Sequence, residues 1–279
     1  MLEVINFYKF FDVADPRALG ERWLGLAARN DLKGTLLLAP EGTNSTLAGE
    51  SPALDAFLRE IEPDCSLEDV IIKRMPVAKL PLPKLKLKVK PEIVTTGWNA
   101  DWKANQGTFV SPKQFREMLD DPEVVVIDTR NDYEYYVGTF RGARVLPLNE
   151  FDQFEETLPA LEDLRDRKIV TFCTGGIRCE KAVPLLKKKG FERVYQLQGG
   201  ILNYFEELGG DDWEGECFVF DYRCSIKPDL SRGTFQFCES CGQPTRQGLC
   251  TECNAASYQP AFDGRRLEKG RHQDGSAGS

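Results

Sequence analysis

Between residues 108 and 210, short apolar runs alternate with helical patterns, and this alternation constrains the fold more than any other feature. Strands that alternate with helices predict a parallel sheet with helices on both faces. Sheets of this kind bind ligands at the carboxyl ends of their strands, so we expect the functional site there. The predicted strands are Val124–Asp128, Val145–Pro147, Ile169–Phe172 and Val194–Leu197, and the predicted helices are Phe151–Leu164, a segment ending at Lys189, and Ile201–Leu208.

The first 95 residues follow another pattern, in which two helices are distributed among four strands. Asp15-Pro16 and Ser51-Pro52 are typical helix starts, since the first residue can cap the helix and proline suits its first turn. This order predicts a small ferredoxin-like α+β domain. Its predicted strands are Val4–Phe10, Gly34–Ala39, Thr43–Ala48 and Val70–Lys73.

A basic segment over residues 73–90 stands out in a chain whose net charge is −8. The acidic total argues against a uniformly basic surface for nucleic acid, but a local patch remains compatible with RNA binding. Lysines alternate with apolar residues over 84–90, so a strand would place lysines on one face. They could protect an edge strand from aggregation or contact phosphates. The basic residues of the segment, our candidates for contacting a nucleic-acid backbone, are Lys73, Arg74, Lys79, Lys84, Lys86, Lys88 and Lys90.

The chain contains one histidine, His272, and nine cysteines. A histidine this close to the carboxyl end makes a Ser-His-Asp triad, a Cys-His pair or a histidine-rich metal site improbable. The odd and clustered cysteines favour thiols, metal ligands or catalysis over a disulfide framework. We find neither a targeting signal nor a run long enough to span a bilayer, and we expect a cytoplasmic protein.

The loop that begins at Cys173 is the most informative stretch for chemistry. It follows a predicted strand, contains two glycines and precedes a helix. Glycine amides, the helix start and the charge of Arg178 would all favour a thiolate at Cys173, which is the nucleophilic form. The alternative is a buried cysteine in a tight turn. We predict that Cys173 and Arg178 are catalytic and that the loop consists of Thr174, Gly175, Gly176 and Ile177.

Three further residues near this loop have open roles. Cys179 is either a resolving thiol that forms a transient disulfide with Cys173, and so a third catalytic residue, or a small packing residue. Asp128 and Arg130 end the neighbouring strand. They either line the same pocket or form an internal ion pair that supports the loop.

A second group of cysteines has the spacing of a metal site. Two Cys-x-x-Cys pairs, Cys238/Cys241 and Cys250/Cys253, are separated by a short glycine-containing segment. The two sulfurs of one pair can bind the same metal ion from a tight turn. Two such pairs around one ion complete a tetrahedral site. A redox pair and an iron–sulfur site are the alternatives. We predict structural zinc.

Several motifs resemble a known family. The loop Cys-x-x-Gly-x-Arg, the segment from Asp128 to Glu134, the Gly138–Gly142 turn and Gln198-Gly-Gly-Ile resemble rhodanese domains. The stretch Gly34-Thr-Leu-Leu-Leu-Ala-Pro-Glu-Gly-Thr-Asn, the string Lys-Val-Lys-Pro-Glu-Ile-Val and the extended loop Cys-Thr-Gly-Gly-Ile-Arg-Cys-Glu-Lys are similar to the tRNA uridine(34) hydroxylases.

This resemblance implies oxygen-dependent conversion of the wobble uridine of tRNA to 5-hydroxyuridine, with molecular oxygen as co-substrate and the anticodon region as partner. A rhodanese-type sulfurtransferase carrying a persulfide and a zinc-stabilised RNA-binding or scaffold protein are the alternatives. An organic cofactor and the oligomeric state stay open. We expect a ferredoxin-like domain over 1–95, a rhodanese-like domain over 96–225, a zinc-binding segment over 226–260 and a disordered tail over 261–279.

Overall fold

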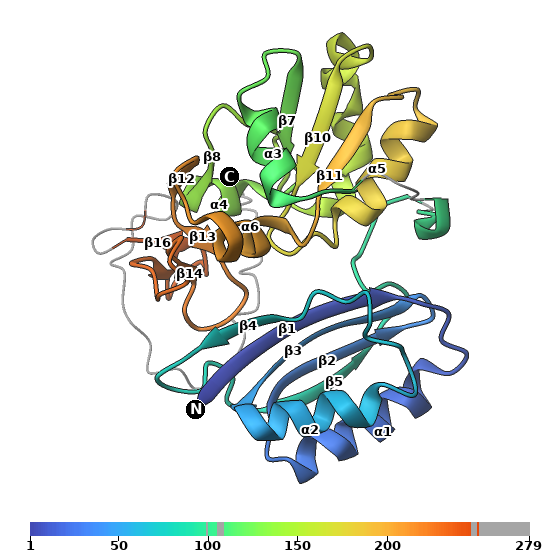
Figure 1. Cartoon of the computed structure of the whole chain (residues 1–279), viewed down its shortest axis with the longest axis vertical. Coiled ribbons are helices and arrows are strands. Elements are labelled where there is room, and N and C mark those ends of the chain that lie inside the picture. The colour runs from blue at the N-terminus through green and yellow to red at the C-terminus, as the bar shows by residue number, and fades with distance from the viewer. Residues whose placement is uncertain (99, 105–108, 247–249, 251–279) are drawn as a thin grey trace, which may run out of the picture.

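The chain builds two sheet-based domains, and a loop-rich segment follows them (Figure 1). The computed structural model describes residues 1–98, 100–104, 109–246 and 250. Helices α1 (Pro16–Arg29) and α2 (Ser51–Ile61) cover one face of the first sheet. The opposite face of that sheet is turned towards the second domain.

The amino-terminal domain confirms the predicted ferredoxin-like arrangement. Its strands β1, β2, β3 and β4 lie in the order β4-β1-β3-β2, with β3 antiparallel to both β1 and β2. This is the split βαβ pattern. The strands are β1 (Leu2–Phe10), β2 (Lys33–Ala39), β3 (Gly42–Glu50) and β4 (Lys73–Pro76).

The predicted strand Val70–Lys73 is wrong in its position, because β4 begins only at Lys73. Val70 closes a turn by donating its backbone N–H to the carbonyl of Leu67. Val70 and Ile72 then pack against the core under the helices instead of joining the ladder. Helix α1 begins as predicted, since the Asp15 side chain accepts hydrogen bonds from Arg17 N and Ala18 N.

Strand β1 has two unlike faces. Ile5 and Phe7 are buried in the core beneath the helices. Asn6 and Tyr8 alternate with them and therefore lie on the face turned towards the second domain. Polar residues on this face provide groups that reach into the other domain.

A fifth strand, β5 (Leu85–Val89), extends the first sheet and pairs in parallel with β2 at its edge. Leu85 and Leu87 pack against the helical core. The alternation of the strand therefore places Lys86 and Lys88 on the opposite face, as the sequence predicts. This edge position fits both interpretations of the lysines.

The second domain has the predicted parallel sheet, in the order β6-β11-β10-β7-β9. Helices α3 (Pro112–Leu119) and α6 (Gly200–Leu208) contribute to one core, and α5 (Cys179–Lys188) contributes to the core on the other face. The strands are β6 (Phe109–Val110), β7 (Val124–Asp128), β9 (Arg144–Val145), β10 (Lys168–Phe172) and β11 (Val194–Leu197).

Two predicted elements of this domain differ in detail. Phe151–Leu164 forms a run of 3-10 helix, η2, with Pro159 inside it. Proline has no N–H to donate and disfavours a regular α-helix at this point. The strand expected over Val145–Pro147 is the short β9, which ends at Val145. The remaining short elements are η1 (Trp102–Ala104), α4 (Asp132–Val137) and β8 (Gly138–Phe140).

The carboxyl-terminal segment consists of short hairpins. Strand β12 (Trp213–Gly215) pairs with β8, and β13 (Cys217–Phe218) pairs with β14 (Ser225–Ile226). The last hairpin joins β15 (Gln236–Phe237) to β16 (Pro244–Thr245). The predicted tail over 261–279, Cys253 and His272 lie outside the described residues. Within the part of the chain that the structure describes, no helix is both long and apolar enough to cross a membrane.

A buried lysine joins the two domains. Lys181 lies in the first turns of α5, and its side chain is fully buried. Its ammonium contacts Glu41 of the β2–β3 turn at 2.6 Å and Glu92 of the interdomain segment at 3.0 Å. A buried charge is tolerated only where it is paired, so these contacts fix α5 against the first domain.

Candidate active site

Cys173 directly follows β10 and lies at the carboxyl end of the parallel sheet. Its side chain is fully buried, and the backbone N–H of Gly176 donates to its Sγ at 3.1 Å. Gly176 has a φ of +100°, and a Cβ at this position would lie 2.9 Å from the Tyr8 hydroxyl. Both the positive φ and this close approach require glycine.

The surroundings of Cys173 favour the thiolate. Burial opposes the charge, but hydrogen bonding with Cys179, the guanidinium of Arg178 and the backbone amides of Arg178 and Gly176 outweigh it. The pKa of Cys173 is therefore lowered well below its usual value. These amides and Arg178 are the groups that the sequence analysis expects to act on this sulfur.

Arg178 is held by a buried carboxylate. Its guanidinium forms two contacts with Glu134, at 2.5 and 2.8 Å, and Thr174 Oγ1 donates to the same carboxylate at 3.3 Å. Burial works against charge in Glu134, but the neighbouring Arg178 keeps the pKa of Glu134 below its usual range. This two-pronged pair fixes the arginine beside the cysteine loop.

Cys179 begins helix α5 and is fully buried. Its Sγ lies 3.6 Å from Thr129 Oγ1. Burial and the neighbouring Cys173 raise the pKa of Cys179, so the two sulfurs form a pair of one thiolate and one thiol. In such a pair the thiol can donate to the thiolate.

Asp128 and Arg130 form an internal ion pair. Both side chains are fully buried, and Arg130 Nε and Nη2 donate to the Asp128 carboxylate at 2.9 and 2.6 Å. Arg130 also donates to the Gly138 carbonyl at 2.6 Å. This geometry favours the supporting role over the pocket-lining one.

The first domain reaches the cysteine loop through Lys73 and Tyr8. Lys73 Nζ donates to the carbonyl of Gly175 at 3.0 Å, and the ammonium lies 5.6 Å from the centre of the Tyr8 ring. Burial lowers the pKa of Lys73 to about 8 against the favourable charge of Cys173. Lys73 is only 2% exposed, so it is separated from the accessible basic residues with which the sequence grouped it.

The other basic residues lie elsewhere on the first domain. Arg74 contacts Glu3 and Asp55 on the helix-covered side of the sheet. Lys84, Lys86 and Lys90 are exposed along β5 and its ends, and Lys88 is half-buried there. Lys79 is exposed in the segment between β4 and β5. The structure thus keeps the β5 lysines together and detaches Lys73 and Arg74 from them.

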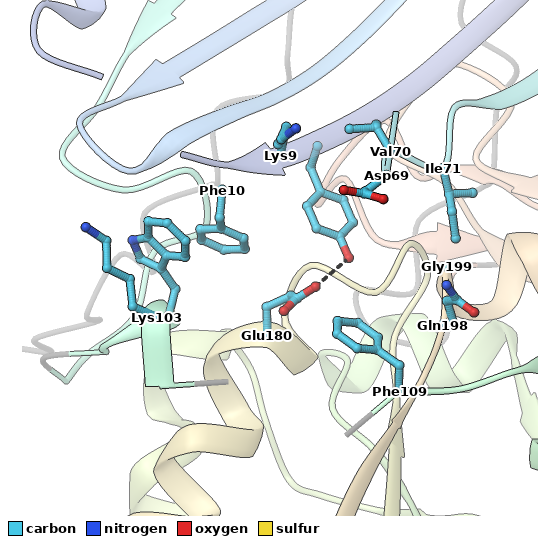
Figure 2. A pocket seen from close by; sticks show the side chains of 12 residues that line it. Lys9, Phe10, Asp69, Val70, Ile71, Lys103, Phe109, Glu180, Gln198 and Gly199 are labelled. Atoms are coloured by element: carbon cyan, nitrogen blue, oxygen red, sulfur yellow. Dashed lines mark hydrogen bonds between the residues drawn. The ribbon is translucent and has the colours of Figure 1, made fainter. Parts of the chain in front are cut away.

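A pocket of about 420 Å³ opens between the two domains beside the cysteine loop. Its aromatic lining residues are Tyr8, Phe10, Trp102 and Phe109. In Figure 2, Glu180 lies between Phe10 and Phe109, and the dashed line is the hydrogen bond that Tyr8 donates to Glu180 at 3.2 Å.

Glycines separate this pocket from the sulfur of Cys173. Gly176 donates to the sulfur, and its Cβ position lies 3.6 Å from the backbone nitrogen of Gly199, which lines the pocket. Ile177 and Thr174 are half-buried within the same loop. The loop and the pocket therefore meet through glycine backbone at this point.

The carboxyl-terminal cysteines form a separate cluster that could hold a metal ion. The sulfur atoms of Cys238, Cys241 and Cys250 all lie within 4.8 Å of one another, and those of Cys241 and Cys250 are 3.7 Å apart. Sulfurs at ~2.3 Å from a tetrahedral zinc ion would be about 3.8 Å apart. The Gly242 N–H donates to the Cys238 carbonyl, which closes the turn of the first pair. Cys253, the fourth predicted ligand, lies outside the described residues.

Sequence reasoning missed Tyr8, Glu180 and the aromatic residues of the pocket. The alternation in β1 was a usable signal, because Tyr8 and Asn6 are polar on the face opposite Ile5 and Phe7. This alternation shows which face of β1 does not belong to the core, but it cannot show that this face contacts a loop more than 160 residues away.

The family models that match this chain fall on the same two domains that the structure shows. A family model described as a UPF0176 acylphosphatase like domain matches residues 2–93, and one for the rhodanese-like domain matches residues 111–207. A curated protein of Synechocystis sp. named tRNA uridine(34) hydroxylase is 42% identical over 258 residues, which cover 91% of this chain and 93% of that protein.

Two further relatives carry the same name. The protein of Picosynechococcus sp. is 43% identical, over 86% of this chain and 82% of its own length. The protein of Teredinibacter turnerae is also 43% identical, over 88% of this chain and 77% of its own length. The similarity therefore extends across both domains.

Proposed function

The chain belongs to the tRNA uridine(34) hydroxylase family, and we propose that it converts the wobble uridine of tRNA to 5-hydroxyuridine at Cys173. The observation that carries this proposal is the position of a stabilised thiolate beside an aromatic pocket between the domains. An enzyme that modifies a base must take the base out of its stack, and aromatic side chains can hold it.

The thiolate of Cys173 adds to C6 of the uracil ring, which is an electrophilic position. This addition moves electron density to C5 and makes that carbon nucleophilic. Arg178 and the amides of the loop hold the sulfur in the charged form that the addition needs.

Molecular oxygen is the co-substrate in this proposal. One oxygen atom enters at C5 and the other leaves as water, which requires two electrons in addition to those of the ring. After Cys173 has left C6, oxidation of the Cys173 and Cys179 thiols to a disulfide supplies these two electrons to the peroxide at C5 and releases its outer oxygen as water, and an external thiol would restore both sulfurs. The adjacent placement of the two sulfurs supports this role for Cys179.

We also propose that the carboxyl-terminal cysteines bind structural zinc. Cys238, Cys241 and Cys250 fit zinc by their thiolate chemistry and by the spacing of their sulfurs, and Cys253 would be the fourth ligand. Four protein ligands would leave zinc no open position, so its contribution is to fold the last hairpin.

The anticodon region would approach along the face of the first sheet that no helix covers. The β5 lysines lie on that face, and Tyr8 on the same face leads to the cysteine loop. Lysines at this edge can contact phosphates while one base enters the pocket. A tRNA substrate is consistent with the expected cytoplasmic location.

Nucleoside mass spectrometry of tRNA from a strain that lacks the protein tests the proposal. We expect loss of 5-hydroxyuridine and its derivatives, with restoration by the wild-type gene and not by Cys173→Ala. Loss of thiolated nucleosides in place of 5-hydroxyuridine would instead identify a sulfurtransferase, and unchanged tRNA would overturn the assignment.

A further inference from the structure

Two carboxylates, Glu180 and Asp69, line the interdomain pocket, and they differ in their relation to the cysteine loop. Glu180 follows Cys179 directly and lies in the first turn of α5. Its Oε1 accepts a hydrogen bond from the Tyr8 hydroxyl of the other domain. Asp69 lies in the segment before β4, on the first-domain side of the pocket (Figure 2).

The proposed reaction needs a base after oxygen has entered at C5. At that stage C6 still carries the sulfur of Cys173 and C5 still carries its original hydrogen. The C5=C6 double bond is restored only when this proton is removed and the sulfur leaves. Cys173 is itself bonded to the ring and cannot act as the base, so the base must be another group that lines the pocket.

We propose that Glu180 is the general base that removes the C5 proton and that Tyr8 is the positioning residue that holds its carboxylate. This inference rests on the proposed function. As the carboxylate takes the proton, the C5–H electron pair becomes the C5=C6 bond and the C6–S pair returns to Cys173 as a thiolate. The protonated Glu180 then releases its proton to solvent, and no oxidant or reductant is consumed in this step.

The contacts of Tyr8 explain why one domain positions a base on the other. Burial first, and then the charge of Glu180, raises the pKa of Tyr8, so the phenol keeps its proton and remains a donor. The Lys73 ammonium lies 5.6 Å from the centre of the phenol ring, and Lys73 also holds the Gly175 carbonyl. The same two side chains therefore contact both the base and the nucleophile's loop.

The test is hydrogen exchange at C5 without oxygen, in deuterated buffer, with the full-length enzyme and unmodified tRNA. Addition of Cys173 to C6 allows C5 to take up deuterium, and removal of the original hydrogen followed by departure of sulfur yields uridine that is one mass unit heavier. Mass spectrometry of the nucleosides measures this exchange independently of hydroxylation.

We expect wild-type enzyme to exchange the C5 hydrogen and Cys173→Ala to show no exchange. Glu180→Gln should lower the exchange rate about 100-fold or more, which is typical for loss of a general base. Glu180→Asp should recover part of the exchange rate. Tyr8→Phe should lower the exchange rate about tenfold, because the Glu180 carboxylate remains but loses the hydrogen bond that positions it. Two variants serve as matched controls at exposed positions and should exchange at the wild-type rate: Glu117→Gln and Tyr136→Phe.

Wild-type exchange rates in Glu180→Gln would overturn the assignment of the base and leave the proposed nucleophile in place. Loss of exchange in Asp69→Asn together with full exchange in Glu180→Gln would transfer the role to Asp69. No exchange by the wild-type enzyme would overturn the addition step itself, and with it the proposed function. Alkylation of Cys173 at the wild-type rate in the variants of Glu180, Tyr8 and Asp69 establishes that the loop has folded.

Discussion

The cysteine loop over residues 173–179 and the β13–β14 hairpin over residues 217–226 both bury cysteines near an arginine–carboxylate pair, but Cys173 of the loop and Cys217 of the hairpin differ in protonation. Cys173 accepts a hydrogen bond from the Gly176 N–H, whereas Cys217 donates to the Phe218 carbonyl. Burial raises the pKa of Cys217 to about 12, while the pKa of Cys173 is lowered.

The groups that act on the two sulfurs explain the difference, because Cys173 receives hydrogen bonds from backbone amides and Cys179, whereas the pKa of Cys217 stays raised although the charge of Arg130 lowers it. Arg178 is held by Glu134 from another element and lies beside Cys173. Arg223 is held by Asp221, two residues away, and burial together with the charge of Asp221 raises the pKa of Cys224. Burial alone therefore keeps a cysteine protonated, and donors directed at the sulfur are needed to reverse this effect.

Replacement of the sulfurs should separate the two regions most strongly. Cys173→Ala should lower hydroxylation at least about 1,000-fold, because the nucleophile is lost. Cys217→Ala removes an equally buried thiol and should keep hydroxylation within about twofold of wild type, with a modest loss of stability. Single-turnover assays with purified tRNA measure both rates. Equal activities of the two variants would contradict the comparison.

Loss of each arginine should show that only one of them acts on a sulfur. Arg178→Gln should lower hydroxylation about 100-fold at neutral pH, since the charge that favours the thiolate is removed. Arg223→Gln also leaves a buried carboxylate without its partner and should destabilise the fold comparably, by ~3–5 kcal/mol. Urea unfolding and alkylation of Cys173 distinguish them, because only Arg178→Gln should shift the pH dependence of alkylation upwards.

The pH dependence of alkylation should separate the sulfurs within the native protein. Cys173 should react with iodoacetamide with a midpoint below the ~8.5 of a free cysteine, and the rate should fall as pH falls through the lowered pKa. Cys217 and Cys224 should remain unlabelled until the protein unfolds. The pKa of Cys173 is lower in the folded protein than in the unfolded chain. At pH values between the two, the unfolded chain binds the extra proton, so the stability of the folded protein should rise with pH in that window. Peptide mass mapping after timed alkylation measures the labelling.

Metal removal should affect the carboxyl-terminal side only. A chelator should release zinc from the cluster of Cys238, Cys241 and Cys250 and increase hydrogen exchange in β15 and β16, because these short strands depend on the metal for their stability. The midpoint for alkylation of Cys173 should not change. A shift of that midpoint on chelation would show that the two groups of cysteines are coupled.

The β5 lysines should give the smallest effect. Lys86→Gln combined with Lys90→Gln should weaken tRNA binding a few-fold at physiological salt, and the slope of log affinity against log salt should become shallower by about 0.7–0.9 for each phosphate that the variant no longer neutralises. The pair Lys113→Gln and Lys188→Gln removes two exposed lysines from the second domain and should leave the slope unchanged. Filter binding over a range of salt concentrations measures both.

The cysteine loop could be predicted from the sequence because its parts are neighbours in the chain. A strand, two glycines, an arginine and a helix start fall within a dozen residues, and local geometry alone brings their amides together. The lysine alternation in β5 was predictable for the same reason, since the period of a strand fixes which side chains share a face.

The interdomain contacts could not be predicted in this way. Lys73 meets Gly175, and Tyr8 meets Glu180, only because the open face of one sheet packs against the end of another. The charge of Lys73 suggested a surface role, and its burial is visible only in the folded chain. Whether Asp128 and Arg130 line the pocket or form an internal ion pair likewise depends on their burial, which the periodicity of the sequence does not reveal.

Lys181 bears on how a protein of this kind can change over generations. Its cation is matched by one acid from the turn of the first sheet and another from the connecting segment, and it has no exposed surface of its own. Recombination that exchanged either domain for an unrelated one would leave this charge without its counterions. Exchange of one domain is therefore expected to succeed only where Lys181 and its two acids are retained or replaced together, although each domain has a fold that could in principle stand alone.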